Sequence, residues 1–212
     1  MQETVRRWLP AAVVLTGVGY IVAAPDEPLA LSLLFKAIPM VLIILYAIAL
    51  LPAERRPIHV LLPIGLGFAV VGDVTLHWFL VGLTAFLVAH LFYLAGFLTR
   101  VRATVGRVAA VVPLALFGFL IGIELLTAVR ASGDTELLLP VAVYILVILA
   151  MAWVAILTGN RWAAVGSLLF VASDTILAWN MFVENVAYSG ALVMTTYYGA
   201  QLLIARSLAD FE

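Results

Sequence analysis

Three charged side chains stand inside apolar stretches where an isolated charge is unstable. Lys36 is the only lysine among the 212 residues and lies in "LALSLLFKAIPMVLIILYAIALL". Asp73 lies in "GLGFAVVGDVTL" and Asp174 in "GSLLFVASDTILA". Burying any of these charges in hydrocarbon costs several kcal/mol unless the charge is paired or hydrated, so such residues are usually functional. We therefore treat these three residues as the centre of a candidate site.

Two carboxyl groups beside one ammonium group can divide into an acid and an anion. Neighbouring carboxylates in an apolar site resist being ionised together, whereas a lysine beside one of them favours its charged form. In glycosidases one carboxyl of such a pair donates a proton and the other stabilises developing positive charge. We expect Asp73 and Asp174 to be catalytic in this way, with Lys36 tuning the pair. A structural ion triad, or a proton or ion pathway, would use the same residues.

Other polar side chains in apolar segments are candidates for binding substrate or positioning water. They are His90, Ser173, Asn180, Tyr197, Tyr198 and Gln201. Helical spacing lets Gln201 share a face with either Tyr197 or Tyr198, although such groups also serve helix packing alone. His90 could relay protons, bind a phosphate, or be a hydrogen-bonded residue of the core.

We expect neither a metal nor a cofactor. The chain has no cysteine, which excludes thiolate catalysis and cysteine-based metal sites. His59 and His77 are about 27 Å apart along one helix, which excludes a zinc site with three histidines. A mixed site of His77 and Asp73 stays open, since these residues are one turn apart. The sequence contains no Gly-x-Ser-x-Gly, P-loop, HExxH or dinucleotide-binding motif.

The composition is that of an integral membrane protein. Apolar residues make up 66% of the chain, charged residues 11%, and the mean hydropathy is +1.20. A formal net charge of −1 gives no sign of nucleic-acid binding. The bilayer is thus the expected surrounding, while the oligomeric state is left open.

Eight segments are long enough to cross a bilayer. A hydrocarbon core roughly 30 Å thick needs about 20 helical residues. We predict an all-α polytopic protein with eight transmembrane helices in a single transmembrane domain, 1–212. The predicted helices cover residues 6–24, 29–51, 58–77, 80–98, 106–129, 137–158, 161–181 and 188–206.

The arginines fall on one side of the predicted bundle. If the connections alternate between two faces, one face carries Arg130 alone. The other face carries Arg6, Arg7, Arg55, Arg56, Arg100, Arg102, Arg107, Arg161 and Arg206. By the positive-inside rule, both termini are cytoplasmic in a multi-pass protein of the inner (plasma) membrane.

The two aspartates lie in an internal repeat. The segments "GLGFAVVGDVTL" and "GSLLFVASDTIL" align without gaps at an offset of 101 residues. Because this offset spans four predicted crossings, we expect two parallel four-helix halves, 1–104 and 105–212. Chance similarity between apolar helices is the alternative.

Helical rise predicts that the charged residues share one layer. Lys36 lies roughly 10 Å below the outer end of its helix, and Asp73 and Asp174 lie within about seven residues of theirs. His90 and Tyr197 lie deeper, near the midplane. We therefore expect a polar pocket that opens outward.

Five short motifs in order resemble the lysoplasmalogenase (YhhN-type) membrane family: "FKAIPM", "GD..L", "F..AH..Y", "GS.LF..SD..LA" and "YY.AQ.LI". The resemblance extends over nearly the whole chain. It implies an eight-helix enzyme whose substrate is a lysophospholipid. The implied reaction is hydrolysis of the vinyl ether bond of lysoplasmalogen to a fatty aldehyde and glycerophosphoethanolamine or glycerophosphocholine.

The candidate residues suit that chemistry. Vinyl ether hydrolysis begins with protonation of carbon and passes through an oxocarbenium ion, so it needs an acid, a nearby anion and a placed water. Asp73 and Asp174 could supply the first two, in either order. A hydrolase of another lysolipid, a small-molecule or proton-coupled transporter, and a non-catalytic lipid-binding protein are the other readings.

Overall fold

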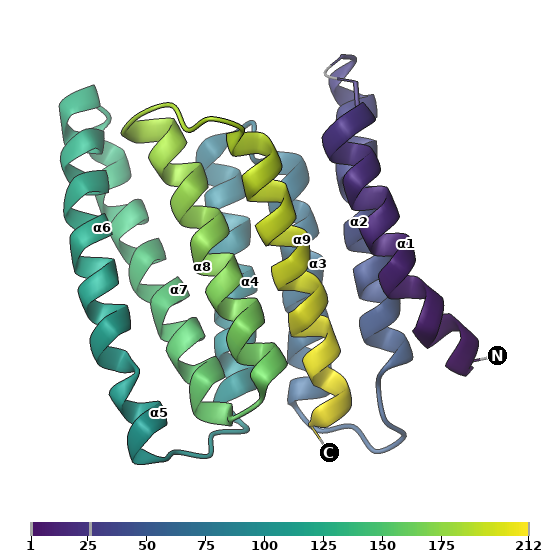
Figure 1. Ribbon diagram of the computed structural model, residues 1–212. Helices are drawn as coiled ribbons and strands as arrows, with labels where there is room; N and C mark the ends of the chain where they lie inside the picture. Colours follow the sequence, from purple (N-terminus) through teal and green to yellow (C-terminus); the bar gives the residue numbers. More distant parts are fainter. Residues whose placement is uncertain (1, 26, 212) are drawn as a thin grey trace.

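The protein is a bundle of long helices. The computed structural model describes residues 2–25 and 27–211, and this part of the chain contains helices and no strand (Figure 1). The α-helices are α1 (Gln2–Ala23), α2 (Leu29–Ala49), α3 (Ile58–Thr75), α4 (Phe79–Leu98), α5 (Val105–Ala109), α6 (Val111–Ser132), α7 (Leu138–Thr158), α8 (Arg161–Phe182) and α9 (Ser189–Ser207). Short 3₁₀ turns cover Thr135–Leu137 and Leu208–Asp210. The all-α prediction is confirmed.

The predicted segments correspond to the helices to within a few residues, with one difference. The fifth segment was expected to be one helix, but it is divided at Ala110 into the short α5 and the long α6. Pro113 explains the break, because proline has no N–H to donate to the carbonyl of Ala109 one turn earlier. The hydrogen bond from Leu114 N to Ala110 O restarts the helix.

The chain is a multi-pass membrane protein. In the described part, six helical stretches are long and apolar enough to span a bilayer: Leu29–Ala49, Ile58–Thr75, Phe79–Leu98, Val105–Ser132, Thr135–Thr158 and Arg161–Phe182. The helices α1 and α9 run beside them but are more polar (Figure 1). Part of the polarity of α9 comes from Tyr197, Tyr198 and Gln201, whose side chains are buried in the bundle. Eight crossings therefore stay a prediction.

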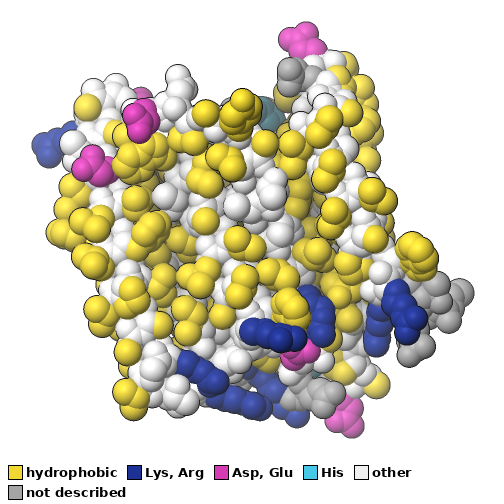
Figure 2. All heavy atoms as spheres, in the orientation of Figure 1, with side chains coloured by type: hydrophobic (Ala, Val, Ile, Leu, Met, Phe, Trp, Pro, Cys, Tyr) yellow, Lys and Arg dark blue, Asp and Glu magenta, His cyan; other side chains and the backbone are white. Residues whose placement is uncertain are grey.

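Both termini lie at the same end of the bundle (Figure 1). On the face shown in Figure 2, most Lys and Arg side chains gather toward that end. This is the arrangement that the alternating loops predicted. The assignment of that end to the cytoplasm rests on the positive-inside rule and stays a prediction.

Two glycines allow close approach within the pairs α3–α4 and α8–α9. A Cβ at Gly65 would overlap the ring of Tyr93 and lie 3.1 Å from Ala89 O. A Cβ at Gly166 would lie 2.9 Å from Ala200 O. Gly65 and Gly166 are matched positions of the predicted repeat, and each stands where its helix meets the next one. The repeat itself stays a prediction.

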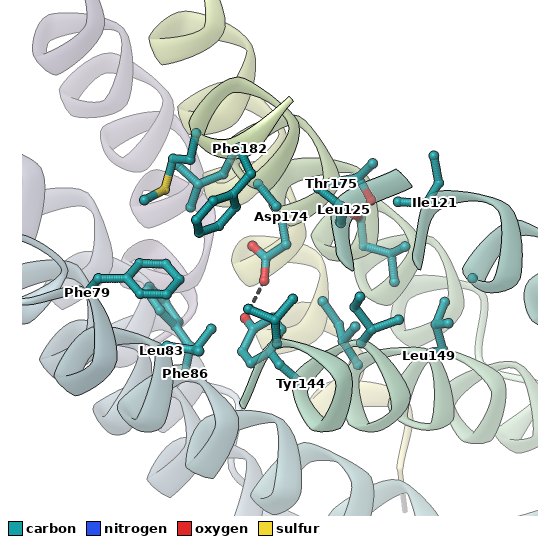
Figure 3. A pocket seen from close by; sticks show the side chains of 18 of the residues that line it. Phe79, Leu83, Phe86, Ile121, Leu125, Tyr144, Leu149, Asp174, Thr175 and Phe182 are labelled. Carbon is teal, nitrogen blue, oxygen red and sulfur yellow. Dashed lines mark hydrogen bonds between the residues drawn. The ribbon is translucent and has the colours of Figure 1, made fainter. Parts of the chain in front are cut away.

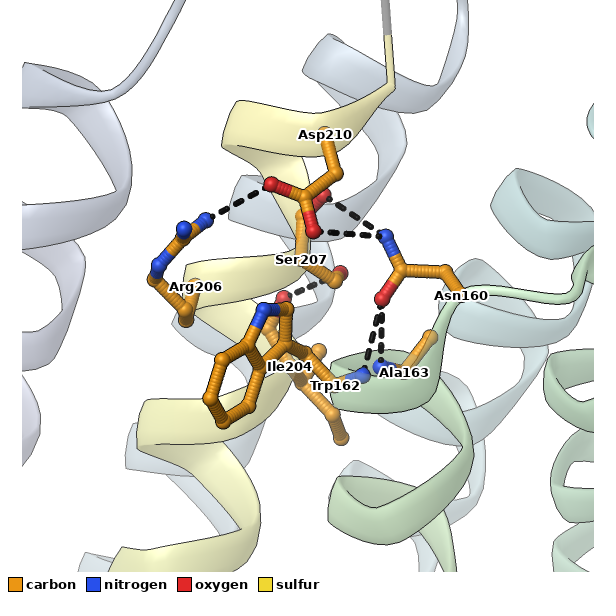
Figure 4. A network of polar contacts seen from close by, with 7 residues as sticks. All are labelled: Asn160, Trp162, Ala163, Ile204, Arg206, Ser207 and Asp210. Atoms are coloured by element: carbon orange, nitrogen blue, oxygen red, sulfur yellow. Dashed lines mark hydrogen bonds and ion pairs between the residues drawn. The ribbon is translucent and has the colours of Figure 1, made fainter.

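A polar network joins the start of α8 to the end of α9 (Figure 4). Asn160 caps α8, because its Oδ1 accepts hydrogen bonds from Trp162 N at 2.9 Å and Ala163 N at 3.1 Å. Its Nδ2 donates to Ser207 O at 3.4 Å and Asp210 Oδ2 at 3.5 Å. One side chain therefore holds two helix ends together at the end of the bundle where the termini lie.

Gly166→Ala is expected to lower the thermal unfolding temperature in detergent. The new methyl group would lie 2.9 Å from Ala200 O and 3.0 Å from Ile204 N, so the backbone of α9 must move. Gly67→Ala is the control, because a Cβ there has no neighbouring heavy atom within 4 Å. Alanine at Gly67 should gain about 1 kcal/mol of helix propensity. Equal unfolding temperatures for the two variants would contradict close packing at Gly166.

Candidate functional site

A buried ion pair joins α2 to α3. Lys36 Nζ lies 3.4 Å from Asp73 Oδ1 and donates a hydrogen bond to Asp73 O, also at 3.4 Å. The exposed fractions of the two side chains are 14% and 3%. The hydroxyl of Tyr197, on α9, donates to Asp73 Oδ2 at 2.6 Å. Both carboxylate oxygens of Asp73 are therefore satisfied, one by a cation and one by a phenol.

The same region ties α9 to α2 through the backbone. The Tyr198 hydroxyl donates to Lys36 O at 2.9 Å. Pro39, one turn beyond Lys36, cannot donate to the carbonyl of Phe35, and α2 continues through it. Neighbouring tyrosines of α9 thus hold the two partners of the ion pair, one through a carboxylate and the other through a main-chain carbonyl.

Asp174 has a different environment. The Tyr144 hydroxyl, on α7, donates a hydrogen bond to Asp174 Oδ2 (Figure 3). Within residues 2–25 and 27–211, no cation forms an ion pair with Asp174. Its side chain is only partly buried, because the carboxyl faces two cavities. The two aspartates therefore share a hydrogen-bonded tyrosine but differ in the presence of a positive charge.

A cavity of about 260 Å³ is lined by both Asp73 and Asp174, and we call it the polar cavity because the charged residues meet there. Its walls come from α1, α2, α3, α4, α8 and α9, and Ser189 and Gly190 at the start of α9 place it toward the end of the bundle opposite the termini. The polar side chains that line it are Tyr20, Lys36, Asp73, Ser173, Asp174, Asn180, Ser189 and Tyr197. The charged residues chosen from the sequence thus meet in one place.

A second, apolar cavity adjoins the polar one. It lies among α4, α6, α7 and α8, and Figure 3 shows Asp174 pointing into it between phenylalanine and aliphatic side chains. The residues that line both cavities are Leu76, Phe86, Asp174 and Leu177. Among the residues that the structure describes, Asp174 is the one charged residue that lines the apolar cavity. Its carboxyl therefore stands at the boundary between a polar and an apolar space.

Ser173 and Asn180 line the polar cavity, but each also serves the backbone. Ser173 Oγ donates to Val193 O at 3.1 Å, which joins α8 to α9. Asn180 Oδ1 accepts from Val186 N at 3.0 Å and so holds the turn that follows α8. Both side chains therefore help to hold the backbone around the cavity.

Three of the sequence candidates, His90, Tyr198 and Gln201, lie outside both cavities. His90 is fully buried, and its Nδ1 lies 2.6 Å from Phe86 O. A carbonyl only accepts, so Nδ1 carries the proton and Nε2 has a bare lone pair without a partner in the described part of the chain. Gln201 Oε1 accepts from Tyr93 OH at 2.8 Å, and these residues belong to the core beneath the cavities.

Tyr144 is a residue of the candidate site that was not predicted from the sequence. It is the only tyrosine of α7 and stands among aliphatic residues in "LLPVAVYILVILA". A lone phenol in an otherwise apolar span was a usable signal, because a buried hydroxyl needs a partner. Its spacing could not identify Asp174 as that partner, since α7 and α8 meet only in the folded chain.

The two residues of the open metal alternative differ in their exposure, since His77 is exposed and Asp73 is buried. His77 is exposed beside Trp78, with the ring centroids 4.1 Å apart. In the residues that the structure describes, no group of three or more His, Asp and Glu side chains is placed to hold a metal ion.

Comparison with known proteins decides the family. The model of the YhhN family matches residues 31–208. This chain belongs to the YhhN family. Lysoplasmalogenase TMEM86B of Mus musculus is 33% identical over 208 residues, which cover 96% of this chain and 87% of the relative. Lysoplasmalogenase TMEM86A of Homo sapiens is 34% identical over 203 residues, covering 87% and 81%.

A bacterial relative extends the comparison. A lysoplasmalogenase of Mycobacterium bovis is 34% identical over 133 residues, which cover 59% of this chain and 49% of the relative. No solved structure matches the chain. The family that the five motifs resembled is therefore confirmed, and in this YhhN protein those motifs contain Lys36, Asp73 and Asp174.

Lys36→Met is expected to destabilise the fold by about 3–5 kcal/mol, because it leaves the buried Asp73 carboxylate without its cation. Arg206→Met is the matched control, since the Arg206–Asp210 pair is 34% and 40% exposed. An exposed pair contributes about 0–1 kcal/mol. Unfolding in detergent measures both losses.

The double variant Lys36→Met/Asp73→Asn separates lost charge pairing from lost packing. Removing both charges should recover part of the stability that Lys36→Met loses. A double variant less stable than Lys36→Met would contradict a coupled ion pair.

Proposed function

We propose that the protein is a membrane hydrolase that cleaves the vinyl ether bond of lysoplasmalogens. The products would be a fatty aldehyde and glycerophosphoethanolamine or glycerophosphocholine. The observation that carries the proposal is a single cavity lined by two carboxyl groups, of which Asp73 alone has a cation in the described part of the chain. The chain that builds this cavity is 33% identical to a lysoplasmalogenase over 96% of its length.

Asp73 is the anion of the proposed mechanism. Lys36 and Tyr197 both stabilise a negative charge on its carboxylate. A fixed anion beside the reacting carbon stabilises the oxocarbenium ion as it forms. The same carboxylate then accepts a proton from the attacking water.

Asp174 is the acid. Without a cation beside it, a carboxyl group in apolar surroundings favours the neutral, protonated form. Tyr144 occupies Asp174 Oδ2, which leaves Oδ1 to carry the proton. Tyr144 is thus a positioning residue.

The reaction closes with one water consumed. The Asp174 proton adds to the vinyl carbon remote from oxygen, and the ether oxygen shares its lone pair with the adjacent carbon. Water adds to that carbon and passes a proton to Asp73, giving a hemiacetal. The hemiacetal hydroxyl returns a proton to Asp174, Asp73 protonates the ether oxygen, and the carbon–oxygen bond breaks to aldehyde and alcohol.

The remaining candidates take supporting roles. Ser173, Asn180 and Tyr197 line the polar cavity and would position water or the glycerophosphate headgroup. Tyr198 holds Lys36 through its carbonyl, while His90 and Gln201 support the site from the core. We further propose eight crossings in the inner (plasma) membrane with cytoplasmic termini, so that the polar cavity opens toward the outer leaflet.

Purified protein should release aldehyde from a lysoplasmalogen and no fatty acid from an acyl lysolipid. Asp174→Asn should lower kcat by about 10²–10⁴-fold, because the proton donor is lost. Asp73→Asn should also abolish most activity. Asp134→Asn is the control, since Asp134 is exposed on the connection between α6 and α7.

This assay tests the proposed substrate and the proposed mechanism separately. Fatty acid release without aldehyde would identify a hydrolase of another lysolipid. Full activity of Asp73→Asn and Asp174→Asn would exclude catalysis by two carboxyl groups.

Tyr144→Phe is expected to lower kcat roughly tenfold while leaving KM nearly unchanged. The variant removes only the hydroxyl that orients Asp174, and phenylalanine keeps the ring that packs at the site. Steady-state kinetics provides the measurement. A change confined to KM would instead mean that the Tyr144 hydroxyl binds substrate.

A further inference from the structure

The apolar cavity brings a hydrocarbon-like space next to the proposed acid, Asp174. Its walls are mostly aliphatic and aromatic side chains of α4, α6, α7 and α8, and Asp174 is the one charged residue among the described residues that line it. Asp174, Leu76, Phe86 and Leu177 also line the polar cavity, so the two spaces share a wall at the acid. A molecule that occupies both must be polar at one end and apolar at the other, with its junction beside Asp174.

We infer that the apolar cavity binds the single hydrocarbon chain of the substrate, and that Gly118 and Leu149 determine which chain lengths are accepted. The inference rests on the proposed function, because a vinyl ether is the junction between a chain and a glycerophosphate headgroup. With the headgroup in the polar cavity, the vinyl carbons lie at the shared wall. That places them beside Asp174, the residue that must protonate one of them.

The lining of the apolar cavity suits a hydrocarbon chain. Methylene groups of a chain in this space would contact Phe79, Leu83 and Ile148. Burial of these methylene groups against apolar side chains favours binding.

The deep end of the apolar cavity lies between α6 and α7. Leu149 is five residues beyond Tyr144, so it lies roughly 7.5 Å deeper along α7 than the residue that holds Asp174. Gly118 of α6 packs against it, and a Cβ at Gly118 would overlap Leu149 Cδ1. The absence of a side chain at Gly118 therefore leaves Leu149 room to lie away from the path of a long chain.

Gly122, one helical turn beyond Gly118 on α6, offers a matched control. Gly122 is buried at the same contact between α6 and α7, but it does not line the cavity. A Cβ there would meet only Ile145 Cδ1, at 4.0 Å. Gly122→Ala thus changes the helix contact without narrowing the chain path.

The test compares two chain lengths in two measurements. Substrates are one short-chain and one long-chain lysoplasmalogen, the shorter chosen to end before Gly118 and the longer to reach it. The same lengths of saturated alkyl-ether lysophosphocholine, which has no vinyl bond, are titrated into the protein, and binding is followed by intrinsic tryptophan fluorescence. Gly118→Val, Leu149→Ala and Gly122→Ala are compared with the unaltered chain.

Gly118→Val should weaken binding and kcat/KM for the long chain by roughly tenfold relative to the short one. Leu149→Ala should move the preference the other way, and Gly122→Ala should leave it unchanged. If Gly118→Val does not fold, Leu149→Ala alone decides. A length preference that is the same in all folded variants would overturn the inference. Length-dependent binding without aldehyde release would overturn the proposed reaction and leave the chain site in place.

Discussion

The contact between Lys36 and Asp73 is the constraint on which the rest of the site depends. A single ammonium group and a carboxylate within an apolar bundle must neutralise each other, so α2 and α3 meet where these residues stand. Tyr197 adds α9 to the same point. The polar cavity lies beside this point, and Lys36, Asp73 and Tyr197 all line it.

The two aspartates show how similar positions acquire different chemistry. Asp73 and Asp174 stand at matched positions of the aligned segments, and each accepts a hydrogen bond from a tyrosine of another helix. Only Asp73 has the ammonium group of Lys36. One lysine on one side of the site is therefore sufficient to separate the electrostatic behaviour of two otherwise comparable carboxyl groups.

The depth of each polar residue in the membrane could be predicted from the sequence, whereas the direction in which its side chain points could not. Rise along each helix correctly grouped Lys36, Asp73 and Asp174, because charges in hydrocarbon must meet at one level. His90 was placed beneath that level, but nothing in its apolar surroundings revealed that it faces the core and not a cavity. The Tyr144 contact was missed for the same reason. Helices that are apolar on all sides carry little information about rotation around their axes.

Contacts at the first turn of α8 help to fix the rotation of this helix about its axis. The Asn160 cap and its contacts to Ser207 and Asp210 fix the first turn of the helix against α9. Because an α-helix is torsionally stiff and advances about 100° per residue, this first turn sets the azimuth of every later side chain. A slip of one residue at Asn160 would carry the Asp174 carboxyl away from both cavities. The Asn160 cap therefore helps to determine the direction in which the Asp174 carboxyl points, several turns further along α8.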